Sequence, residues 1–170
     1  MEFQELIQKR YSCRKFSGRK VEQKLLDQII EAGRIAPTAC NLQPVKIFQL
    51  ASDRARDAIR STCSCTFGAD SFLLVGCKEE EGWQRCFDQR KFADVDAAIV
   101  ASHMMLAIED LGLSTTWVGY FDAPRLQSLL PQLQGYELIA LFPIGYAAED
   151  AAPADRHFSR KAADEILETL

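Results

Sequence analysis

One long segment, residues 94–113, carries apolar side chains around nearly its whole circumference when it is drawn as a helix. Helices on the surface of a domain keep a polar face, so a helix that is apolar all round is buried on most sides. In a chain of 170 residues, that burial comes either from a central position within the fold or from a second subunit that covers one face. The segment is therefore the expected centre of the fold and a candidate surface for association between copies.

The other apolar segments alternate between helical and extended patterns. Helices are predicted near Phe3, before Pro37, after an N-cap at Ser52, after an N-cap at Asp122, and around Ile166, Leu167 and Leu170. Strands are predicted at residues 45–50, 72–75, 115–121 and 136–142. Because strands and helices do not alternate strictly, the pattern favours one α+β sandwich domain over residues 1–170 rather than a doubly wound sheet.

Residues 78–94 are rich in charge and interrupt the apolar pattern. A charged segment outside the regular elements is expected to leave the core, and this one is a candidate for a mobile lid. Trp83, Phe87 and Phe92 are scattered through it. These three side chains either contact a bound small molecule or anchor the segment to the core.

The charge of the whole chain narrows the possible functions. The formal net charge is −4, whereas duplex recognition needs a dominant basic surface, so nucleic-acid binding is not expected. The first residues lack the basic start of a signal peptide, and no apolar run reaches membrane-spanning length. We therefore expect a cytoplasmic protein with no membrane contact, whose six cysteines are reduced.

Several motifs of common sites are absent from the sequence. It has neither the G-x-G-x-x-G of dinucleotide-binding folds nor the G-x-x-x-x-G-K-[ST] of phosphate-binding loops. Cys63, Cys65, Cys77 and Cys86 are close enough in sequence to be weighed as a metal site. However, C-x-C is not the usual C-x-x-C spacing, and a free cysteine is commonly a small buried apolar residue. No metal is expected, and a thiol-based metal-binding or redox module remains only an alternative function.

Arg10, Ser12 and Arg14 follow one another at every second position. In an extended backbone, side chains at this spacing point to the same face. Two guanidinium groups and a hydroxyl on one face suit a phosphate, because each guanidinium offers a planar fork of donors. The alternative is a helix that ends at Arg10 and continues as a solvated linker.

Four separated segments carry a family resemblance: residues 10–16 (RYSCRKF), 36–44 (APTACNLQP), 111–122 (LGLSTTWVGYFD) and 143–146 (PIGY), with Arg160 beyond them. In this order the chain resembles the nitroreductase family of FMN-dependent oxidoreductases from end to end. The resemblance implies an α+β sandwich with a mainly antiparallel sheet between helices. It also implies a homodimer formed through the long helices, with one FMN in each of two interface pockets.

The resemblance further implies which residues hold the cofactor. The phosphate and ribityl chain are matched by Arg10, Tyr11, Ser12, Arg14 and Arg160. The loop supplied by the partner subunit is matched by Pro37, Thr38, Ala39 and Asn41. The strand along the isoalloxazine edge is matched by Trp117, Val118, Gly119 and Tyr120. Cys40 and Tyr120 depart from the residues that are usual at their positions.

The activity implied by the resemblance is two-electron reduction of nitroaromatics, quinones or similar small acceptors by NADH or NADPH, in a ping-pong cycle. No side chain is expected to be catalytic, because the flavin carries the difficult chemistry. Trp83, Phe87 and Phe92 are the candidate acceptor contacts. Flavin fragmentation, dehalogenation and azoline oxidation occur on the same fold and are the alternatives, since a fold does not determine a function.

Overall fold

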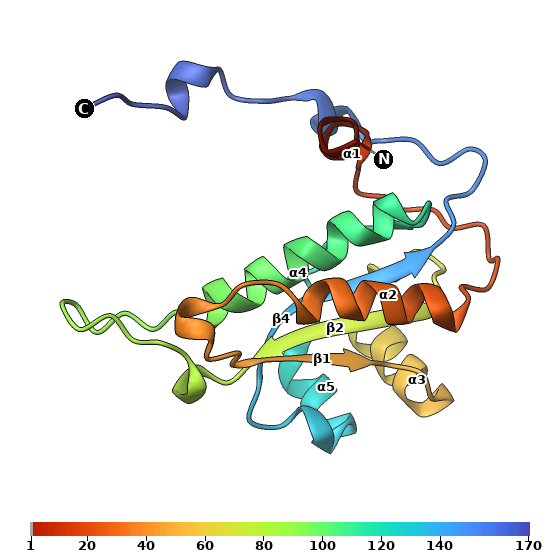
Figure 1. Cartoon of the computed structure of the whole chain (residues 1–170). Helices are drawn as coiled ribbons and strands as arrows, with labels where there is room; N and C mark the ends of the chain where they lie inside the picture. Colours follow the sequence, from red (N-terminus) through yellow and green to blue (C-terminus); the bar gives the residue numbers. More distant parts are fainter. Residues whose placement is uncertain (1) are drawn as a thin grey trace.

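A computed structural model describes residues 2–170 and places a four-stranded sheet at the centre of the molecule, with strand order β1-β2-β4-β3 (Figure 1). All neighbouring strands are antiparallel. The strands are β1 (Val45–Gln49), β2 (Ser71–Cys77), β3 (Ser114–Thr115) and β4 (Glu137–Gly145). The buried strands β2 and β4 are almost continuously apolar, as expected of strands that are covered on both faces.

Helices cover both faces of this sheet. They are α1 (Phe3–Lys9), α2 (Gln23–Arg34), α3 (Asp53–Thr62), α4 (Ala93–Asp110) and α5 (Ala123–Leu129). Helices α2 and α4 share one apolar cluster with the sheet, and α3 and α5 share another. The predicted α+β sandwich with an antiparallel sheet between helices is therefore confirmed.

Helix α4 is the long helix that the apolar pattern predicted, and its central part is buried. Ala101, Met104 and Ile108 are fully enclosed. Helix α2 crosses close to α4 at Gly33, where an added Cβ would lie 2.8 Å from both Ile47 and Met104. A larger residue at this position would have to displace the Ile47 and Met104 side chains, so glycine allows the close approach of α2 to α4.

Two of the predicted helix caps are present. The Ser52 hydroxyl accepts a hydrogen bond from the Ala55 amide at 3.2 Å, and the Asp122 carboxylate accepts one from the Arg125 amide at 3.0 Å. Each oxygen satisfies one of the amide groups that the first turn of a helix leaves unpaired. The caps fix where α3 and α5 begin.

The predicted strand over residues 115–121 is wrong in extent, because β3 ends at Thr115 and only an isolated bridge joins Val118 to Leu141. The register of both contacts puts Thr116 opposite Pro143. The backbone N and C=O of Pro143 point toward residues 115–118, because the Pro143 carbonyl accepts a hydrogen bond from the Thr115 hydroxyl at 2.7 Å. Both groups of a strand residue point toward the same neighbouring strand, so an N–H at position 143 would pair with Thr116. Since proline has no N–H, the ladder is broken at this position.

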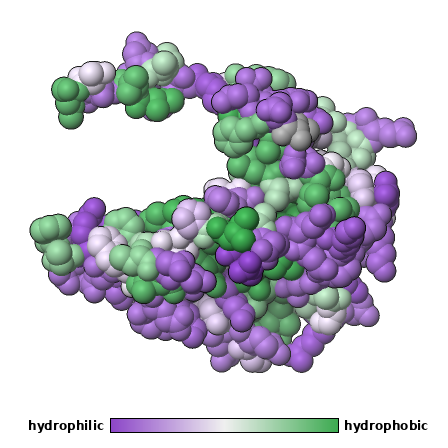
Figure 2. All heavy atoms as spheres, viewed as in Figure 1, coloured by the Kyte–Doolittle hydropathy of each residue, from purple (hydrophilic) through white to green (hydrophobic). Residues whose placement is uncertain are grey.

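The predicted C-terminal helix around Ile166, Leu167 and Leu170 is also wrong. Only a 3₁₀ turn, Ala163–Glu165, forms there, and these three side chains are at least 70% exposed. A helix this short needs packing against another surface, and the chain supplies none at this place. The last residues, 155–170, form an extended segment that we call the C-terminal arm, which runs out beyond α4 (Figure 1). A wide recess separates the arm from the body of the molecule, and the arm carries apolar atoms (Figure 2).

Residues 82–92 leave the body of the molecule between β2 and α4, as the charge pattern predicted. Gln84 and Lys91 form an isolated antiparallel bridge, and the Arg85 amide donates to the Arg90 carbonyl at 2.9 Å. Phe87 is 92% exposed at the tip. The segment is thus an exposed excursion with an internal bridge, and its mobility stays a prediction.

Among residues 2–170, no helix is long and apolar enough to cross a bilayer.

Candidate functional site

The segment with Arg10, Ser12 and Arg14 lies along the outer edge of β3. Helix α1 ends at Arg10, whose backbone leaves the helical region (φ −56°, ψ 127°). Ser12 then forms a parallel bridge with Thr115, and the Cys13 amide donates to the Thr115 carbonyl at 2.9 Å. Ser12 is half-buried at this edge and Arg14 is exposed. The basic segment is therefore paired with the sheet rather than being a free linker.

The same edge carries residues 117–120. Val118 exchanges two backbone hydrogen bonds with Leu141, at 3.0 and 2.9 Å, and its side chain is buried. Trp117 is half-buried on the opposite face, where its ring meets Phe142 edge-on at 5.6 Å. Gly119 and Tyr120 are exposed. Thr115 bridges Ser12 and lies two residues before Trp117 in the sequence, so residues 117–120 lie at the same edge of the sheet as the basic segment.

The C-terminal arm passes close to this edge before it runs out. The His157 ring lies 6.4 Å from the Tyr11 ring in an edge-on arrangement. Arg160 follows three residues later and is exposed, with its guanidinium donating to the backbone carbonyls of His157 and Ser159. The arm therefore carries Arg160 to the neighbourhood of Tyr11, although its side chain contacts its own backbone.

A buried carboxyl lies behind the basic segment. Glu109, in the last turn of α4, is only 8% exposed, and burial raises its pKa, while the nearby Lys9 and Arg10 oppose that rise. Burial is also the main reason that the pKa of the Tyr11 phenol is raised to about 12, with Cys13 and Glu109 adding to it. Tyr11 therefore stays protonated at neutral pH and is a hydrogen-bond donor.

Glu109→Gln is expected to raise the melting temperature at pH 7 relative to the original chain. Because the folded-state pKa of Glu109 is raised, its ionisation favours the unfolded state, and stability is lost as pH rises through that pKa. The advantage of the variant should disappear near pH 4, where the carboxyl is protonated in both states. Thermal melts of both proteins across this pH range measure the difference.

Glu31→Gln is the matched control, because Arg34 lowers the pKa of Glu31. Its effect on stability at pH 7 should have the opposite sign or be close to zero, since the pair is exposed. A Glu109→Gln variant that is less stable at pH 7 would mean that Glu109 acts mainly as an ion-pair partner of the basic residues.

The loop with Pro37, Thr38, Ala39 and Asn41 is not brought to this edge. Its 3₁₀ turn, Ala39–Asn41, lies at the other end of α4, where the Ala39 amide donates to the Asp96 carboxylate at 2.8 Å (Figure 1). Helix α4 has 18 residues, which corresponds to about 27 Å. Within one chain, the loop and the basic segment cannot line the same small-molecule site.

The loop has an unusual backbone. Cys40, Asn41 and Gln43 all have φ values between 50° and 54°, in the left-handed region. Such values are uncommon for residues other than glycine, and they cluster at functional sites when the surroundings hold them in place. Here the Thr38 hydroxyl accepts from the Gln43 amide at 3.1 Å, and Asp96 holds Ala39. The loop is therefore fixed from both ends.

Asp96 and Glu109 are two site residues that the sequence interpretation missed. Both are buried acids on α4, at its opposite ends. One carboxylate oxygen of Asp96 holds Ala39, and the other has no hydrogen-bond partner among residues 2–170. The available signal was the presence of acids at both ends of a mostly apolar helix, although Asp94 and Asp110 beside them give no sign of which acids are buried.

The three aromatic residues of the excursion do not lie together. Trp83 packs on Phe92 with ring centroids 5.3 Å apart, and the guanidinium groups of Arg85 and Arg90 lie 5.4 and 5.5 Å from the same Phe92 ring. Trp83, Arg85 and Arg90 thus pack around Phe92 within the excursion, and whether any of the three aromatic residues contacts an acceptor stays a prediction. Phe87 points out alone, and all three lie at the Asp96 end of α4.

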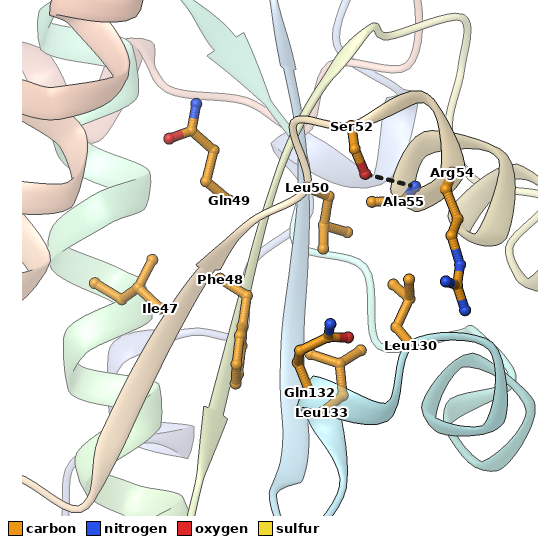
Figure 3. A pocket seen from close by; sticks show the side chains of 10 residues that line it. All are labelled: Ile47, Phe48, Gln49, Leu50, Ser52, Arg54, Ala55, Leu130, Gln132 and Leu133. Atoms are coloured by element: carbon orange, nitrogen blue, oxygen red, sulfur yellow. Dashed lines mark hydrogen bonds between the residues drawn. The ribbon is translucent and has the colours of Figure 1, made fainter.

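Among residues 2–170, three surface hollows exceed about 300 Å³, the lower end of the range for small-molecule sites. One of them, of about 390 Å³, lies at the start of α4 and contains none of the predicted site residues. The other two differ in what lines them. One, of about 530 Å³, is lined by residues 60–64 at the end of α3 and by residues 119–122. The other, of about 370 Å³, lies between β1, the start of α3 and the segment after α5 (Figure 3). In the second hollow, Ser52 caps α3, Gln49 bonds Gln23, and Arg54 bonds the Leu129 carbonyl. The first hollow is the one that contains predicted site residues.

The four cysteines weighed as a metal site are not arranged as one. Cys77 is buried in β2, whereas Cys86 is exposed on the excursion. Among residues 2–170, no group of three or more histidine, cysteine, aspartate or glutamate side chains is arranged to hold a metal ion. The described part of the chain therefore gives the thiol-based alternative no support.

Sequence comparison finds a matching family and related proteins. A model of the nitroreductase family matches residues 7–71 and 66–146. Over 96% of its length the chain is 25% identical to an iodotyrosine dehalogenase 1 homolog of Caenorhabditis elegans, and over 87% it is 26% identical to an NADH dehydrogenase of Thermus thermophilus. It spans 60% of the length of the first relative and 88% of the second.

Solved structures share the fold over the whole chain. A nitroreductase family protein of Clostridium difficile 630 superposes with a TM-score of 0.91 at 33% identity, covering 100% of both chains. A protein of Desulfovibrio desulfuricans, solved in complex with FMN, superposes with a TM-score of 0.78 at 23% identity, covering 100% of this chain and 97% of the other. The antiparallel sheet between helical layers is thus a fold seen in other proteins.

Proposed function

The chain belongs to the nitroreductase family, and from this premise we propose that it is a single-domain, FMN-dependent oxidoreductase that uses NADH or NADPH to reduce small acceptors such as nitroaromatics and quinones. When bound, FMN supplies the redox chemistry, taking a hydride at N5 and delivering two electrons to the acceptor in a ping-pong cycle. The protein residues bind and orient the cofactor and shape the space above it.

The donor set at the edge of β3 fits the phosphate of FMN. A phosphate monoester carries close to two negative charges at neutral pH, and Arg10, Ser12 and Arg14 are held beside Thr115 on one short segment. Arg160 reaches the same neighbourhood on the C-terminal arm. The observation that carries the proposal is that a segment with two arginines and a serine is fixed to the edge of β3, in a chain of net charge −4, because it places phosphate donors on a rigid support.

The segment after β3 fits the flat ring system. Val118 is fixed to β4 by its two backbone hydrogen bonds. Beside it, a Cβ added to Gly119 would meet no atom within 4 Å, so a planar ring can approach the backbone closely. Because the Val118 amide already donates to Leu141, the Gly119 amide that follows it on this fixed backbone is the group suited to orient the flavin edge and to tune its electronics.

A homodimer explains why the two halves of the site lie at opposite ends of α4. If two copies pack their α4 helices antiparallel about a twofold axis, the loop at Asn41 of one copy comes beside Arg14 of the other. The partner would also cover the half-buried side chains of Ile99 and Met105 and the exposed apolar residues of the C-terminal arm. In this arrangement Phe87 of the excursion would reach over the partner's flavin.

The test of this function is an absorption spectrum of the purified protein. We expect flavin bands, either as isolated or after addition of FMN, and bleaching by NADH or NADPH under anaerobic conditions. Addition of a quinone or nitroaromatic should restore the bands. A colourless protein that does not bind added FMN would refute the proposal.

Dehalogenation is the second candidate, favoured only by the similarity to the Caenorhabditis elegans relative. The same flavin site would serve, since the reductive chemistry belongs to the cofactor. Screening the reduced protein against iodinated phenols beside nitro compounds and quinones separates the two. Reoxidation by the iodinated phenols alone, with release of iodide, would favour the second function.

A further inference from the structure

Tyr120 stands exposed at the mouth of the hollow of about 530 Å³ that residues 60–64 form with residues 119–122. Its side chain is 81% exposed. The backbone around it is fixed, because the Asp122 amide donates to the Thr62 carbonyl at 2.9 Å and the Cys63 thiol lies 3.6 Å from the Tyr120 carbonyl. A large aromatic side chain is thus presented to solvent from a rigid support.

The position of the Tyr120 side chain next to Gly119 indicates a role in binding a ligand. The space beside Gly119 is open, and Tyr120 is the next residue along the chain. A hollow of this volume is in the range of about 300–1,000 Å³ that small-molecule sites occupy. Aromatic side chains stack on flat ring systems and clash with bulk that stands out of the ring plane. Tyr120 therefore stands where a flat molecule lying beside Gly119 would meet it.

We propose that Tyr120 sets the acceptor specificity, forming an aromatic wall that stacks on flat acceptors and excludes those with bulk out of the ring plane. This proposal rests on the proposed function, because it assumes that the acceptor binds against a flavin beside Gly119. The Tyr120 side chain would touch the acceptor, whereas the flavin contact that the resemblance implies for residues 117–120 is made by the backbone, which both variants below retain.

The experiment compares the original protein with Tyr120→Ala and Tyr120→Phe, using 1,4-naphthoquinone and the same ring with a tert-butyl substituent. Comparing variant with original for each acceptor cancels the intrinsic reactivity of the quinone. For Tyr120→Ala we expect KM for the flat quinone to rise about tenfold from lost stacking. We also expect kcat/KM for the bulky quinone to rise about fivefold or more, within the range that pocket size controls. Tyr120→Phe keeps the ring and should behave as the original.

Two further measurements decide the interpretation. FMN affinity and the native mass in solution should be the same in all three proteins. If Tyr120→Ala leaves the preference between the two quinones unchanged, if it loses FMN, or if it changes the oligomeric state, the acceptor role is overturned. Failure of the proposed function looks different, since the original protein itself would then fail to bind FMN or to be reduced by a nicotinamide.

Discussion

Arg14→Ala should weaken FMN binding by about ten- to one-hundred-fold, because each hydrogen bond to a charged group contributes about 1.5–3 kcal/mol. Among residues 2–170, the exposed Arg14 side chain donates one hydrogen bond, at 3.3 Å to the Ser12 carbonyl two residues away. Its removal therefore disturbs the fold very little, and the loss should appear in cofactor affinity. Titration of the apoprotein with FMN, followed by quenching of flavin fluorescence, measures it.

Arg160→Ala should lower the affinity by a similar factor, because its guanidinium only caps nearby carbonyls in the structure and is available to turn toward the phosphate. Arg54→Ala is the matched control, an exposed arginine at the start of α3, on the other face of the sheet from α4. It should bind FMN as the original does. Unchanged affinity in both Arg14→Ala and Arg160→Ala would remove the phosphate role from these residues.

A chain that ends at Lys161 should become monomeric and lose its flavin. The truncation keeps His157 and Arg160 but removes Ile166, Leu167 and Leu170, which are exposed in the single chain. Burying each such side chain in a partner contributes about 1.5–3 kcal/mol. After the cost of ordering the arm, we expect the dimer to be weakened by roughly a hundredfold or more. Light scattering at several protein concentrations measures the change.

Full-length variants separate the apolar contribution from chain length. Serine at positions 166, 167 and 170 should have the effect of the truncation, whereas serine in place of Lys161, Asp164 and Glu168 should leave the dimer intact. If the apolar variant keeps both its mass and its flavin, the arm does not hold a partner.

The elements that could be predicted from the sequence are those with a local signal. Ser52 and Asp122 cap their helices because capping depends on the residues within one turn. The extent of the third strand could not be predicted in this way. Thr116 lies opposite Pro143, which has no N–H to donate, and this pairing depends on the register between two segments that are far apart in the sequence. The C-terminal helix failed for a related reason, since its apolar residues have no surface in their own chain to pack on.

The site divides in the same manner. The basic segment at residues 10–14 and the segment at Gly119 could be predicted as candidates because each is a short, recognisable motif. The structure brings both to the β3 edge of the sheet. The acids Asp96 and Glu109 were missed because their importance comes from burial and from what lies beside them. The resemblance implied that the loop at Asn41 comes from a partner subunit, but its separation from Arg14 by about a helix length within one chain depends on how α4 is placed.

That separation along α4 has a genetic consequence. If each site takes its basic edge from one copy and its loop from the other, a defect at Arg14 and a defect at Asn41 damage different halves. In a mixed dimer of two such chains, one site inherits both defects and the other inherits neither. With equal expression and random pairing, about half of the dimers are mixed and each has one intact site, so two alleles that are each inactive alone would restore about a quarter of the full number of sites, as expected when active sites are shared across a twofold axis.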